Sequence, residues 1–423
     1  MTPQVKQRIE QIRRGEVPEG YKRTKAGVVP IEWEEVRIGD VLTQRKILQC
    51  VSEDAPLLSF TIEEGVIDPA DKKSNKRDFL IKDMATKKFA LTEVGDIIYN
   101  PANLKFGAIH RNNLSRGVVS PIYGIFYGEQ DSVFMGYLLH NQRFIDYAKV
   151  YTEGTVEKLK TLKAETFSKL KITIPTISEQ HKIAEMLSLQ DKVIALKEKL
   201  IEEKKSRKTA LLQQLLTGQK RLVGFDDDFE SVKLMDIFSF HKGAGLSKEK
   251  ITPQGQFSCI LYGELFTKYA EIINNVEGRT DFSEGLKSQT YDVLMPGSTT
   301  TSGLDLATAS VILTDDVLLG GDIVVLRPKE KNDTRFWGYL LRKIVKETVK
   351  HTQGVTIIHL NINTFKNAKV KIPKTHAEQT AIANILINAD KEIELLQMEL
   401  DQEKQKKKAL MQLLLTGIVR VDI

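Results

Sequence analysis

The sequence predicts an α+β fold in which two domains of mixed α/β content are separated by two long antiparallel helices that form a coiled coil. Two observations support this prediction. The decapeptide TALLQQLLTG, which ends at Gly218, returns as KALMQLLLTG, which ends at Gly417. Short β-type runs such as GDIIYN and VVLRP are mixed with short helical runs such as RFWGYLLRKIVKET. Because the second half repeats the first, we expect a pseudo-two-fold internal repeat.

The repeat extends over the 40 positions that end at each glycine, with 18 identities and no gap. Each copy follows an apolar, strand-like piece that ends in proline, LKITIP or AKVKIP. Thr176 and Glu179, like Thr375 and Glu378, then have the T-x-x-E spacing of a capping box at a helix start. Both copies end in Thr-Gly, and glycine can take the left-handed conformation that stops a helix. Each copy is therefore predicted to be a helix of about 40 residues, roughly 60 Å long.

Helices of this length are expected to pair, and apolar residues recur along both at alternating spacings of three and four. Four polar residues, Gln190, Lys197, Lys204 and Lys208, interrupt the pattern in the first helix. Equivalent surfaces of two repeats meet antiparallel. The predicted helix-pair seam consists of Leu187, Ile194, Ile201, Leu211, Leu215, Leu386, Ala389, Ile393, Leu396, Leu400, Leu410 and Leu414.

Fainter correspondences relate the segments outside the helices, while the stretches between them share almost nothing. The matching pairs are Trp33–Val41 with Phe229–Ile237, Gly95–Ile98 with Tyr291–Leu294, Gly136–Leu139 with Gly338–Leu341, and Thr166–Phe167 with Thr364–Phe365. Two domains with a common frame and divergent interiors are expected. The predicted organisation is an N-terminal helical segment (1–25), a first domain (26–177), a central long helix (178–222), a second domain (223–375) and a C-terminal long helix (376–423).

The amino-acid composition limits the classes of protein to which this chain can belong. The chain has 423 residues, is 41% hydrophobic and 28% charged, and contains no apolar run of 18 residues, so no membrane span is expected. The N-terminus is too polar for a secretory signal. Cys50 and Cys259 have no metal-ligand spacing and are expected to be reduced thiols of a cytoplasmic protein without a metal. A net charge of +6 permits DNA binding, with additional positive charge supplied by a partner.

The order domain, long helix, domain, long helix, with I-x-I-P before E-Q-x-x-I and a terminal L-L-T-G, resembles the specificity subunits of type I restriction–modification systems. The resemblance covers essentially the whole chain, and GYKRTKAGVVPIEWEEVRIGDV also resembles the usual entry to the first domain. It implies that each domain is a target-recognition domain that reads one half of a bipartite site in double-stranded DNA. It also implies that the helices set the spacer and dock two methyltransferase (modification) subunits, and that endonuclease/translocase (restriction) subunits join for cleavage.

Motifs for intrinsic catalysis are missing from the sequence. The nearest approach to an adenine-methyltransferase motif, Asn100-Pro101-Ala102, lacks the second proline and the aromatic residue. The glycine cluster that begins at Gly243 has Lys248 where a dinucleotide-binding loop needs glycine, and no G-x-x-x-x-G-K-[ST] loop occurs. We therefore expect a non-catalytic protein that needs no cofactor.

Candidate DNA-contacting residues lie in the divergent interior of the first domain. Arginine and asparagine can form paired hydrogen bonds with guanine and adenine edges, and lysine and arginine neutralise phosphates. The run KKSNKR is either a phosphate-contacting loop or a solvated one, and the segment YNPANLKFGAIHRNN either contacts DNA or forms ordinary turns. The candidates are Lys72, Lys73, Lys76, Arg77, Asn100, Asn103, Lys105, His110, Arg111 and Asn112.

The second domain offers a polar turn, MPGSTTTSG, whose hydroxyls either contact DNA or belong to a flexible turn. A basic group precedes it in the sequence. The candidates here are Lys242, Lys248, Ser298, Thr299, Thr300, Thr301 and Ser302. The basic runs KKSRK (204–208) and KQKKK (404–408) are interpreted chiefly as solvated helix faces, and secondarily as docking surfaces for partners.

Two other functions remain open from the sequence. A coiled-coil scaffold that binds other proteins would also use a helix pair, and a methyltransferase-only system would use the same kind of specificity subunit. A fused methyltransferase–specificity enzyme is disfavoured by the length of the chain and by its missing motifs.

Overall fold

The computed structural model describes residues 2–24, 27–72, 86–153, 160–299, 307–349, 358–359 and 362–421. The chain divides into two compact units. The first unit comprises Met1–Glu198 and Glu399–Ile423, and the second comprises Lys199–Met398. Within the described part of the chain, no helix is both long enough and apolar enough to cross a membrane.

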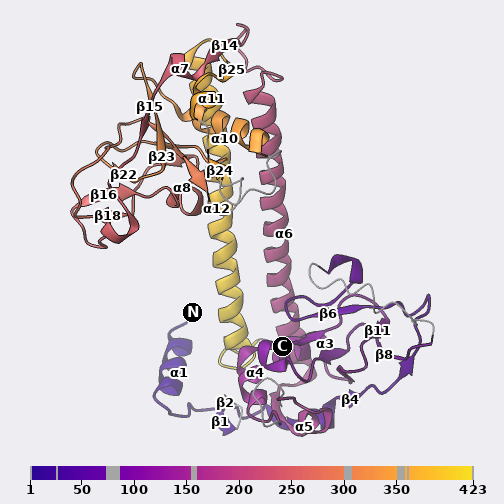
Figure 1. Cartoon of the computed structure of the whole chain (residues 1–423). Helices are drawn as coiled ribbons and strands as arrows, with labels where there is room; N and C mark the ends of the chain where they lie inside the picture. Colours follow the sequence, from indigo (N-terminus) through magenta and orange to yellow (C-terminus); the bar gives the residue numbers. More distant parts are fainter. Residues whose placement is uncertain are drawn as a thin grey trace. The chain divides into compact units, whose positions relative to one another are not determined.

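Two long helices contribute to both units. The helices α6 (Ile177–Leu216) and α12 (His376–Leu414) contain 40 and 39 residues. In each unit they run antiparallel and side by side (Figure 1). All side chains of the predicted seam are buried or half-buried; Leu187 and Leu386, for example, are fully buried. The predicted pair of long antiparallel helices is confirmed.

The polar residues that interrupt the seam of α6 form pairs across the two helices. Within the first unit, the Gln190 side chain donates to the Glu403 carboxylate at 2.7 Å, and Lys197 lies 2.7 Å from Glu399. Within the second unit, Lys204 pairs with Glu392, and Lys208 pairs with Asp390. These contacts fix the register of the pair, because a shift by one turn would leave Gln190 buried without its partner.

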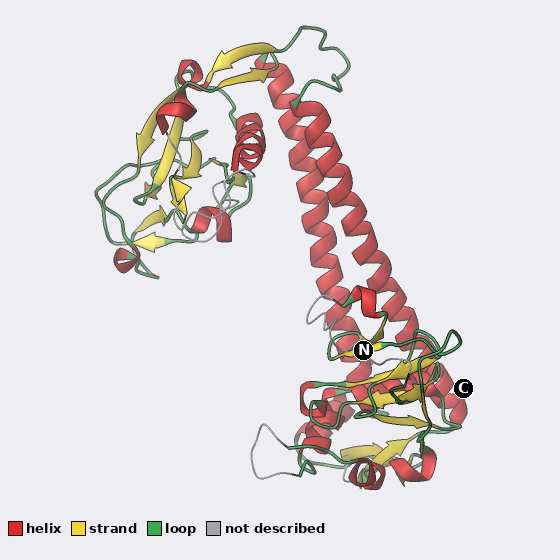
Figure 2. Ribbon diagram, turned by 45° about the vertical axis from the view of Figure 1, so that its right-hand side comes forward, coloured by secondary structure: helices red, strands yellow, loops and turns green. Residues whose placement is uncertain are grey.

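The first unit is built on two antiparallel sheets with helices around them (Figure 2). The larger sheet has the strand order β10-β9-β12-β4 and the smaller β11-β8-β5. The strands of these sheets are β4 (Thr43–Gln44), β5 (Leu48–Gln49), β8 (Phe89–Thr92), β9 (Ile97–Tyr99), β10 (Ile109–Arg111), β11 (Gly117–Val119) and β12 (Gly124–Tyr127). Three two-stranded pairs are β1 (Tyr21–Thr24) with β2 (Gly27–Pro30), β3 (Glu34–Arg37) with β13 (Lys171–Ile174), and β6 (Ser59–Thr61) with β7 (Gly65–Ile67). The helices are α1 (Pro3–Arg13), α2 (Ile38–Val41), η1 (Pro69–Asp71), η3 (Leu104–Phe106), α3 (Ser132–His140), α4 (Gln142–Lys149) and α5 (Ala164–Lys169).

The second unit has a five-stranded sheet of order β15-β23-β19-β21-β17 and a three-stranded sheet of order β18-β16-β22. These strands are β15 (Phe238–Lys242), β16 (Phe257–Ile260), β17 (Ile272–Ile273), β18 (Arg279–Thr280), β19 (Val293–Pro296), β21 (Ser310–Ile312), β22 (Leu318–Leu319) and β23 (Ile323–Pro328). Two pairs are β14 (Glu230–Lys233) with β25 (Lys369–Ile372), and β20 (Ser298–Thr299) with β24 (Ile358–His359). The helices are α7 (Leu234–Ile237), η5 (Lys248–Lys250), α8 (Glu264–Thr267), α10 (Arg335–Val349) and α11 (Ile362–Lys366).

The two units share a frame. The order β10-β9-β12-β4 of the first unit corresponds to β21-β19-β23-β15 of the second. The pair β3–β13, which leads into α6, corresponds to β14–β25, which leads into α12. The main core of each unit also takes in the start of one long helix and the end of the other, as Leu187 with Leu414 and Leu386 with Leu215 show. The predicted α+β fold with an internal repeat is confirmed.

Asp96 and Asp292 are equivalent in the repeat. Their similar hydrogen bonds account for the match between Gly95–Ile98 and Tyr291–Leu294. Each carboxylate is almost fully buried and accepts two hydrogen bonds from an arginine guanidinium, Arg45 for Asp96 and Arg327 for Asp292. Each also accepts the backbone N–H three residues before it. The carboxylate therefore ties the turn before β9 to the residue that follows β4 in the first unit, and the turn before β19 to the neighbouring strand β23 in the second.

At the starts of α6 and α12, each predicted capping box forms only the hydrogen bond to the threonine hydroxyl. The hydroxyls of Thr176 and Thr375 accept the backbone N–H of Glu179 and Glu378, at 3.4 and 3.3 Å. The two glutamate carboxylates instead accept paired hydrogen bonds from arginines that follow the end of the other long helix. A buried carboxylate is better satisfied by a guanidinium than by one backbone N–H, so the long-range partner replaces the local one.

These arginines form equivalent ion pairs in the two units. Arg420, which follows α12, holds Glu179 at 2.8 and 3.0 Å, and Arg221, which follows α6, holds Glu378 at 3.0 and 2.9 Å. The next residue in each repeat, Gln180 or Gln379, donates to the carbonyl of the proline that ends the preceding strand. The E-Q pair in the sequence therefore joins the start of each long helix to the strand before it and to the far end of the other helix.

Candidate nucleic-acid interface

A repeated cluster of tyrosine, aspartate and lysine joins each domain to the helix pair. In the first unit, the Tyr137 hydroxyl of α3 donates to Asp191 of α6 at 2.6 Å. Lys407 of α12 lies 2.5 Å from the same carboxylate and 5.5 Å from the centre of the Tyr137 ring. Burial and the Asp191 carboxylate raise the pKa of Tyr137, so its phenol stays protonated and donates.

The second unit contains the same cluster. The Tyr339 hydroxyl of α10 donates to Asp390 at 2.6 Å, and Lys208 pairs with Asp390 and lies 5.5 Å from the centre of the Tyr339 ring. Lys208 also lies 3.5 Å from Glu271. Lys208 and Lys407 occupy the same position in the repeat, so each long helix carries one lysine that is held by the domain it contacts.

This finding corrects the interpretation of the two basic runs as solvated helix faces for one lysine in each run. The side chains of Lys208 and Lys407 are only 17% and 27% exposed, because each is enclosed between an aspartate and a tyrosine ring. Their neighbours in the runs are more exposed. The signal for this cluster was present in the sequence, since its aspartate and lysine are repeat identities and its tyrosine lies in the repeated G-Y-L-L.

A polar groove of about 580 Å³ lies beside this cluster in the first unit. One wall is formed by the end of β10, by α3 and by the start of α4, and the other by α6 and α12. The residues that line it are His110, Arg111, Asn113, Val133, Gly136, Tyr137, His140, Asn141, Gln142, Ser188, Asp191, Lys404, Lys407, Lys408, Met411 and Gln412. The groove therefore joins two predicted DNA-contacting residues to the basic run of α12.

His110 and Arg111 are held in fixed positions at this groove. A ring nitrogen of His110 lies 2.7 Å from the Ile62 carbonyl, and its ring centre lies 4.4 Å from that of His140. Burial, together with the neighbouring His140, lowers the pKa of His110 to about 4, so the ring is neutral near pH 7. The Arg111 guanidinium donates to the Ser132 hydroxyl at 2.9 Å and to the Asn113 side chain.

Two of the predicted asparagines shape turns. The buried Asn112 amide donates to the Thr92 hydroxyl and to the Ser115 carbonyl, and its oxygen accepts the Leu114 N–H. All of its hydrogen-bonding groups are thus engaged within the domain, and we leave it out of the proposed interface. The side-chain oxygen of half-buried Asn100 accepts the Ala102 N–H at 3.0 Å.

The remaining described candidates of the first domain lie on surface turns. Asn103 and Lys105 belong to the turn around η3, and the Lys105 ammonium lies 5.2 Å from the ring centre of the 63%-exposed Phe106. Half-exposed Lys72 follows η1. Lys73, Lys76 and Arg77 lie outside the described residues.

The described candidates of the second domain lie at two separate places, one at β15 and β20 and the other at η5. Lys242, at the end of β15, lies 3.0 Å from Asp322, whose carboxylate also lies 3.4 Å from the Ser298 hydroxyl of β20. Lys248 is exposed on η5, where the neighbouring Lys250 packs on the Phe282 ring. The backbone of Thr299 belongs to β20. Thr300, Thr301 and Ser302 lie outside the described residues.

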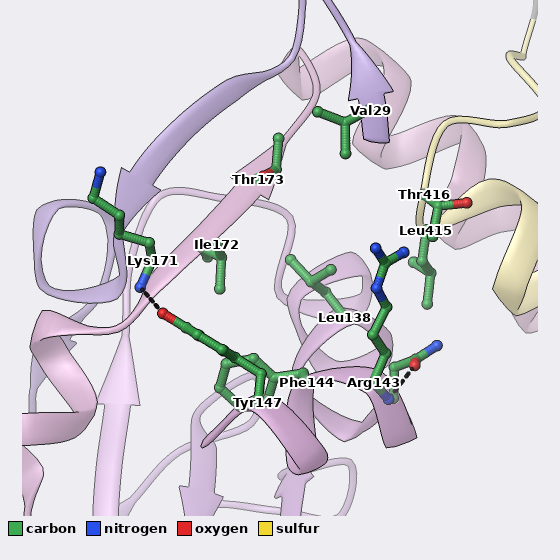
Figure 3. A pocket seen from close by; sticks show the side chains of 11 residues that line it. Val29, Leu138, Arg143, Phe144, Tyr147, Lys171, Ile172, Thr173, Leu415 and Thr416 are labelled. Carbon is green, nitrogen blue, oxygen red and sulfur yellow. Dashed lines mark hydrogen bonds between the residues drawn. The ribbon is translucent and has the colours of Figure 1, made fainter. Parts of the chain in front are cut away.

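A second, mostly apolar cavity of about 100 Å³ lies where β2, α4, β13 and the end of α12 meet (Figure 3). Phe144 and Leu415 from the main core line it, and the Tyr147 hydroxyl accepts the Lys171 N–H at 3.3 Å. The cavity is a packing gap within the joint between domain and helix, and it offers little room for a ligand.

Comparisons with known proteins agree with this architecture. The family model of the type I restriction modification DNA specificity domain matches residues 30–205 and 226–404, once in each half of the chain. Two relatives come from Methanocaldococcus jannaschii. The type I restriction enzyme MjaVIII specificity subunit is 24% identical, with 95% of this chain and 96% of the relative covered. The putative type I restriction enzyme MjaX specificity subunit is also 24% identical, with 95% and 97% covered.

Solved structures show the same fold. The S subunit of a type I restriction-modification system from M. genitalium is 16% identical, with a TM-score of 0.54 and coverage of 92% of this chain and 96% of that chain. A chain from a structure of complex assembly and conformational transition of the type I R-M system is 15% identical, with a TM-score of 0.57 and coverage of 92% and 99%. The duplicated frame and the match of the family model to both halves lead to one conclusion: this chain belongs to the family of type I restriction-modification specificity subunits and carries two DNA specificity domains.

Proposed function

We propose that each domain of this chain reads one half of a bipartite DNA site and that the helix pair sets the number of unread base pairs between the halves. The observation that carries the proposal is the repeated frame with different interiors. The tyrosine–aspartate–lysine cluster and the four corresponding strands are present in both units, while the loops between them differ. A common frame that carries two different reading surfaces suits an asymmetric, two-part target.

The proposed DNA contacts are polar and basic residues of the two domains. In the first domain, Arg111 and Asn113 present side chains that can read base edges, and neutral His110 can exchange hydrogen bonds with a base. The other proposed contacts there are Lys72, Lys73, Lys76, Arg77, Asn100, Asn103 and Lys105. In the second domain they are Lys242, Lys248, Ser298, Thr299, Thr300, Thr301 and Ser302.

Exchange of residues 26–177 for those of a relative with a different target tests this proposal. Mapping of methylated adenines in cells that carry the complete system should show one changed half-site. The other half-site should be unchanged because residues 223–375 are retained, and the gap should be unchanged because both long helices are retained. Changes in both halves would contradict separate reading by the two domains, and a changed gap would contradict the role of the helices.

We also propose that catalysis is supplied by partners. The sequence contains neither a methyltransferase motif nor a P-loop. Methylation would come from two methyltransferase subunits docked on the helix pair, and cleavage from endonuclease/translocase subunits. A solved relative comes from a study of complex assembly of the type I R-M system, and this supports an assembled complex for the present chain.

The surface of α6 in the first unit supports a docked methyltransferase helix. Met186, Leu189, Val193 and Leu196 follow one another at spacings of three, four and three, which places them along one face. Leu189 and Leu196 are 63% and 68% exposed, although α6 already packs against α12 on another side. An exposed apolar row of this kind marks a protein-binding surface, and its spacing fits an amphipathic helix.

The double substitution L189S/L196S should weaken binding of the full chain to its methyltransferase on the order of 100-fold, since each buried leucine contributes about 1.5 kcal/mol or more. Titration calorimetry with the purified subunit measures the affinity. The control E202S/K205S removes an exposed ion pair from the same helix and should bind normally. Equal affinities for the two variants would exclude this face as the docking surface.

A further inference from the structure

We propose that α12 itself forms part of the DNA interface of the first domain, with Lys404 and Lys408 binding the phosphate backbone across the groove from Arg111. The inference rests on the proposed DNA-reading function and extends it to a long helix. Lys404, Lys408 and Arg111 all line the groove of about 580 Å³, although Arg111 is nearly 300 positions away in the sequence.

The charges of the groove favour an anion. Among the described residues that line it, Asp191 is the only carboxylate, and Lys407 together with the Tyr137 hydroxyl already satisfies it. With His110 neutral, the lining also carries Arg111, Lys404 and Lys408, and no carboxylate among its described lining residues pairs with these three cations. Lys404 lies 2.7 Å from Glu198, but both side chains are about half exposed. An exposed pair of this kind contributes little and can be exchanged for a phosphate contact.

The shape and polarity of the groove favour DNA over a small anion. Its lining extends from Arg111 at the end of β10 and Asn113 just after it, past Gln142, to Gln412 of α12. Amide and guanidinium groups that suit base edges therefore lie in the same groove as lysines that suit phosphates. Phosphate contacts fix the register of a protein on DNA, while base contacts select the sequence. The helix would thus position the strand whose bases the domain reads.

The second unit repeats the lysine that contacts the domain, but not the groove. Lys208, the counterpart of Lys407, is held by Asp390 and Tyr339. It lines a hollow of about 250 Å³ together with Lys204 and Arg207. Glu392, which pairs with Lys204, lines the same hollow, whereas Lys205 and Thr209, the counterparts of Lys404 and Lys408, do not. The proposed contact of a long helix with DNA is therefore confined to the first unit.

The test compares two double variants of the full-length chain with the same change in net charge. K404Q/K408Q removes two cations that line the groove. K192Q/K406Q removes two cations outside it, and Lys406 lies on the opposite side of α12 from Lys404, roughly 200° around the helix. The probe is a 40-base-pair duplex of mixed sequence, and its dissociation constant is measured between 50 and 200 mM NaCl.

The slope of log K against log salt is negative, and each lost phosphate contact reduces its magnitude by about 0.9. K404Q/K408Q should therefore reduce the magnitude of the slope by about 1.8, while K192Q/K406Q should leave it near that of the unmodified chain. Equal slopes for the two variants, with DNA binding retained, would overturn the proposal. A normal slope combined with weaker binding of the methyltransferase would overturn it in favour of an acidic protein segment in the groove. Failure of the unmodified chain to bind DNA would instead count against the proposed function.

Discussion

Replacement of Glu179 by alanine is expected to lower the free energy of unfolding of the first unit by about 3 kcal/mol, at the lower end of the usual range for loss of one partner from a buried ion pair. The Glu179 side chain is 1% exposed and accepts three N–H groups, two from Arg420 and one from the Trp33 indole. The loss leaves the Trp33 N–H unpaired in the core. Arg420 is 35% exposed and can still pair with Glu32, which limits the cost.

Hydrogen exchange measured peptide by peptide can follow the two units separately. E179A should raise the exchange rates of peptides from β3, β13 and the start of α6, and leave β14 and β25 unchanged. The matched variant E378A should give the reverse pattern, because Glu378 is held by Arg221 in the second unit. Uniform destabilisation of both units by either variant would contradict the assignment of each ion pair to one unit.

Replacement of Gly417 by alanine is expected to destabilise the first unit by about 2–4 kcal/mol, and the equivalent replacement of Gly218 should cost the second unit only about 1 kcal/mol. Both glycines end a long helix in the left-handed conformation, with φ of +67° and +73°. A Cβ atom at Gly417 would lie 2.5 Å from the Pro30 ring and 3.1 Å from Trp33. At Gly218 the nearest atoms, on the Phe229 ring, lie at 3.4 Å.

Thermal unfolding of the two single variants measures this difference. G417A should show the larger fall in transition temperature, because it adds a steric clash with Pro30 to the backbone strain that both variants share. The variant P30A/G417A offers a control, since it removes the ring against which the new methyl group packs and should recover part of the loss. Equal shifts for G417A and G218A would mean that backbone strain alone determines the cost.

The repeat in the sequence was sufficient to predict the long helices, their antiparallel pairing and the positions of their glycine stops. Local signals carried these predictions, because periodicity, a cap hydroxyl and a terminal glycine each act within a few residues. The partners of the repeated glutamates were missed. Arg420 and Arg221 lie 241 and 157 positions away from them, and no local rule links residues at that separation.

The candidate interface was only partly accessible to sequence reasoning. Arg111 and His110 were selected by residue type, and they line the groove. Asn112 has a residue type that suits DNA but is buried in a turn. The position of Lys404 and Lys408 in the groove was not predicted, because it depends on which domain lies beside α12, and only the three-dimensional structure supplies that neighbour. Polar residues that seemed to weaken the seam, such as Gln190, proved to be paired across it.

The first unit is built from residues at both ends of the chain, and this determines when its core can form during protein synthesis. The second unit is one continuous stretch, and all of its residues are synthesised before Glu399–Ile423. The domain translated first must wait for those last residues, because Leu414, Leu415 and Arg420 complete its core and its buried ion pair. A polypeptide that terminates early would therefore carry an unfinished first domain, and proteases could remove it before it joined a complex.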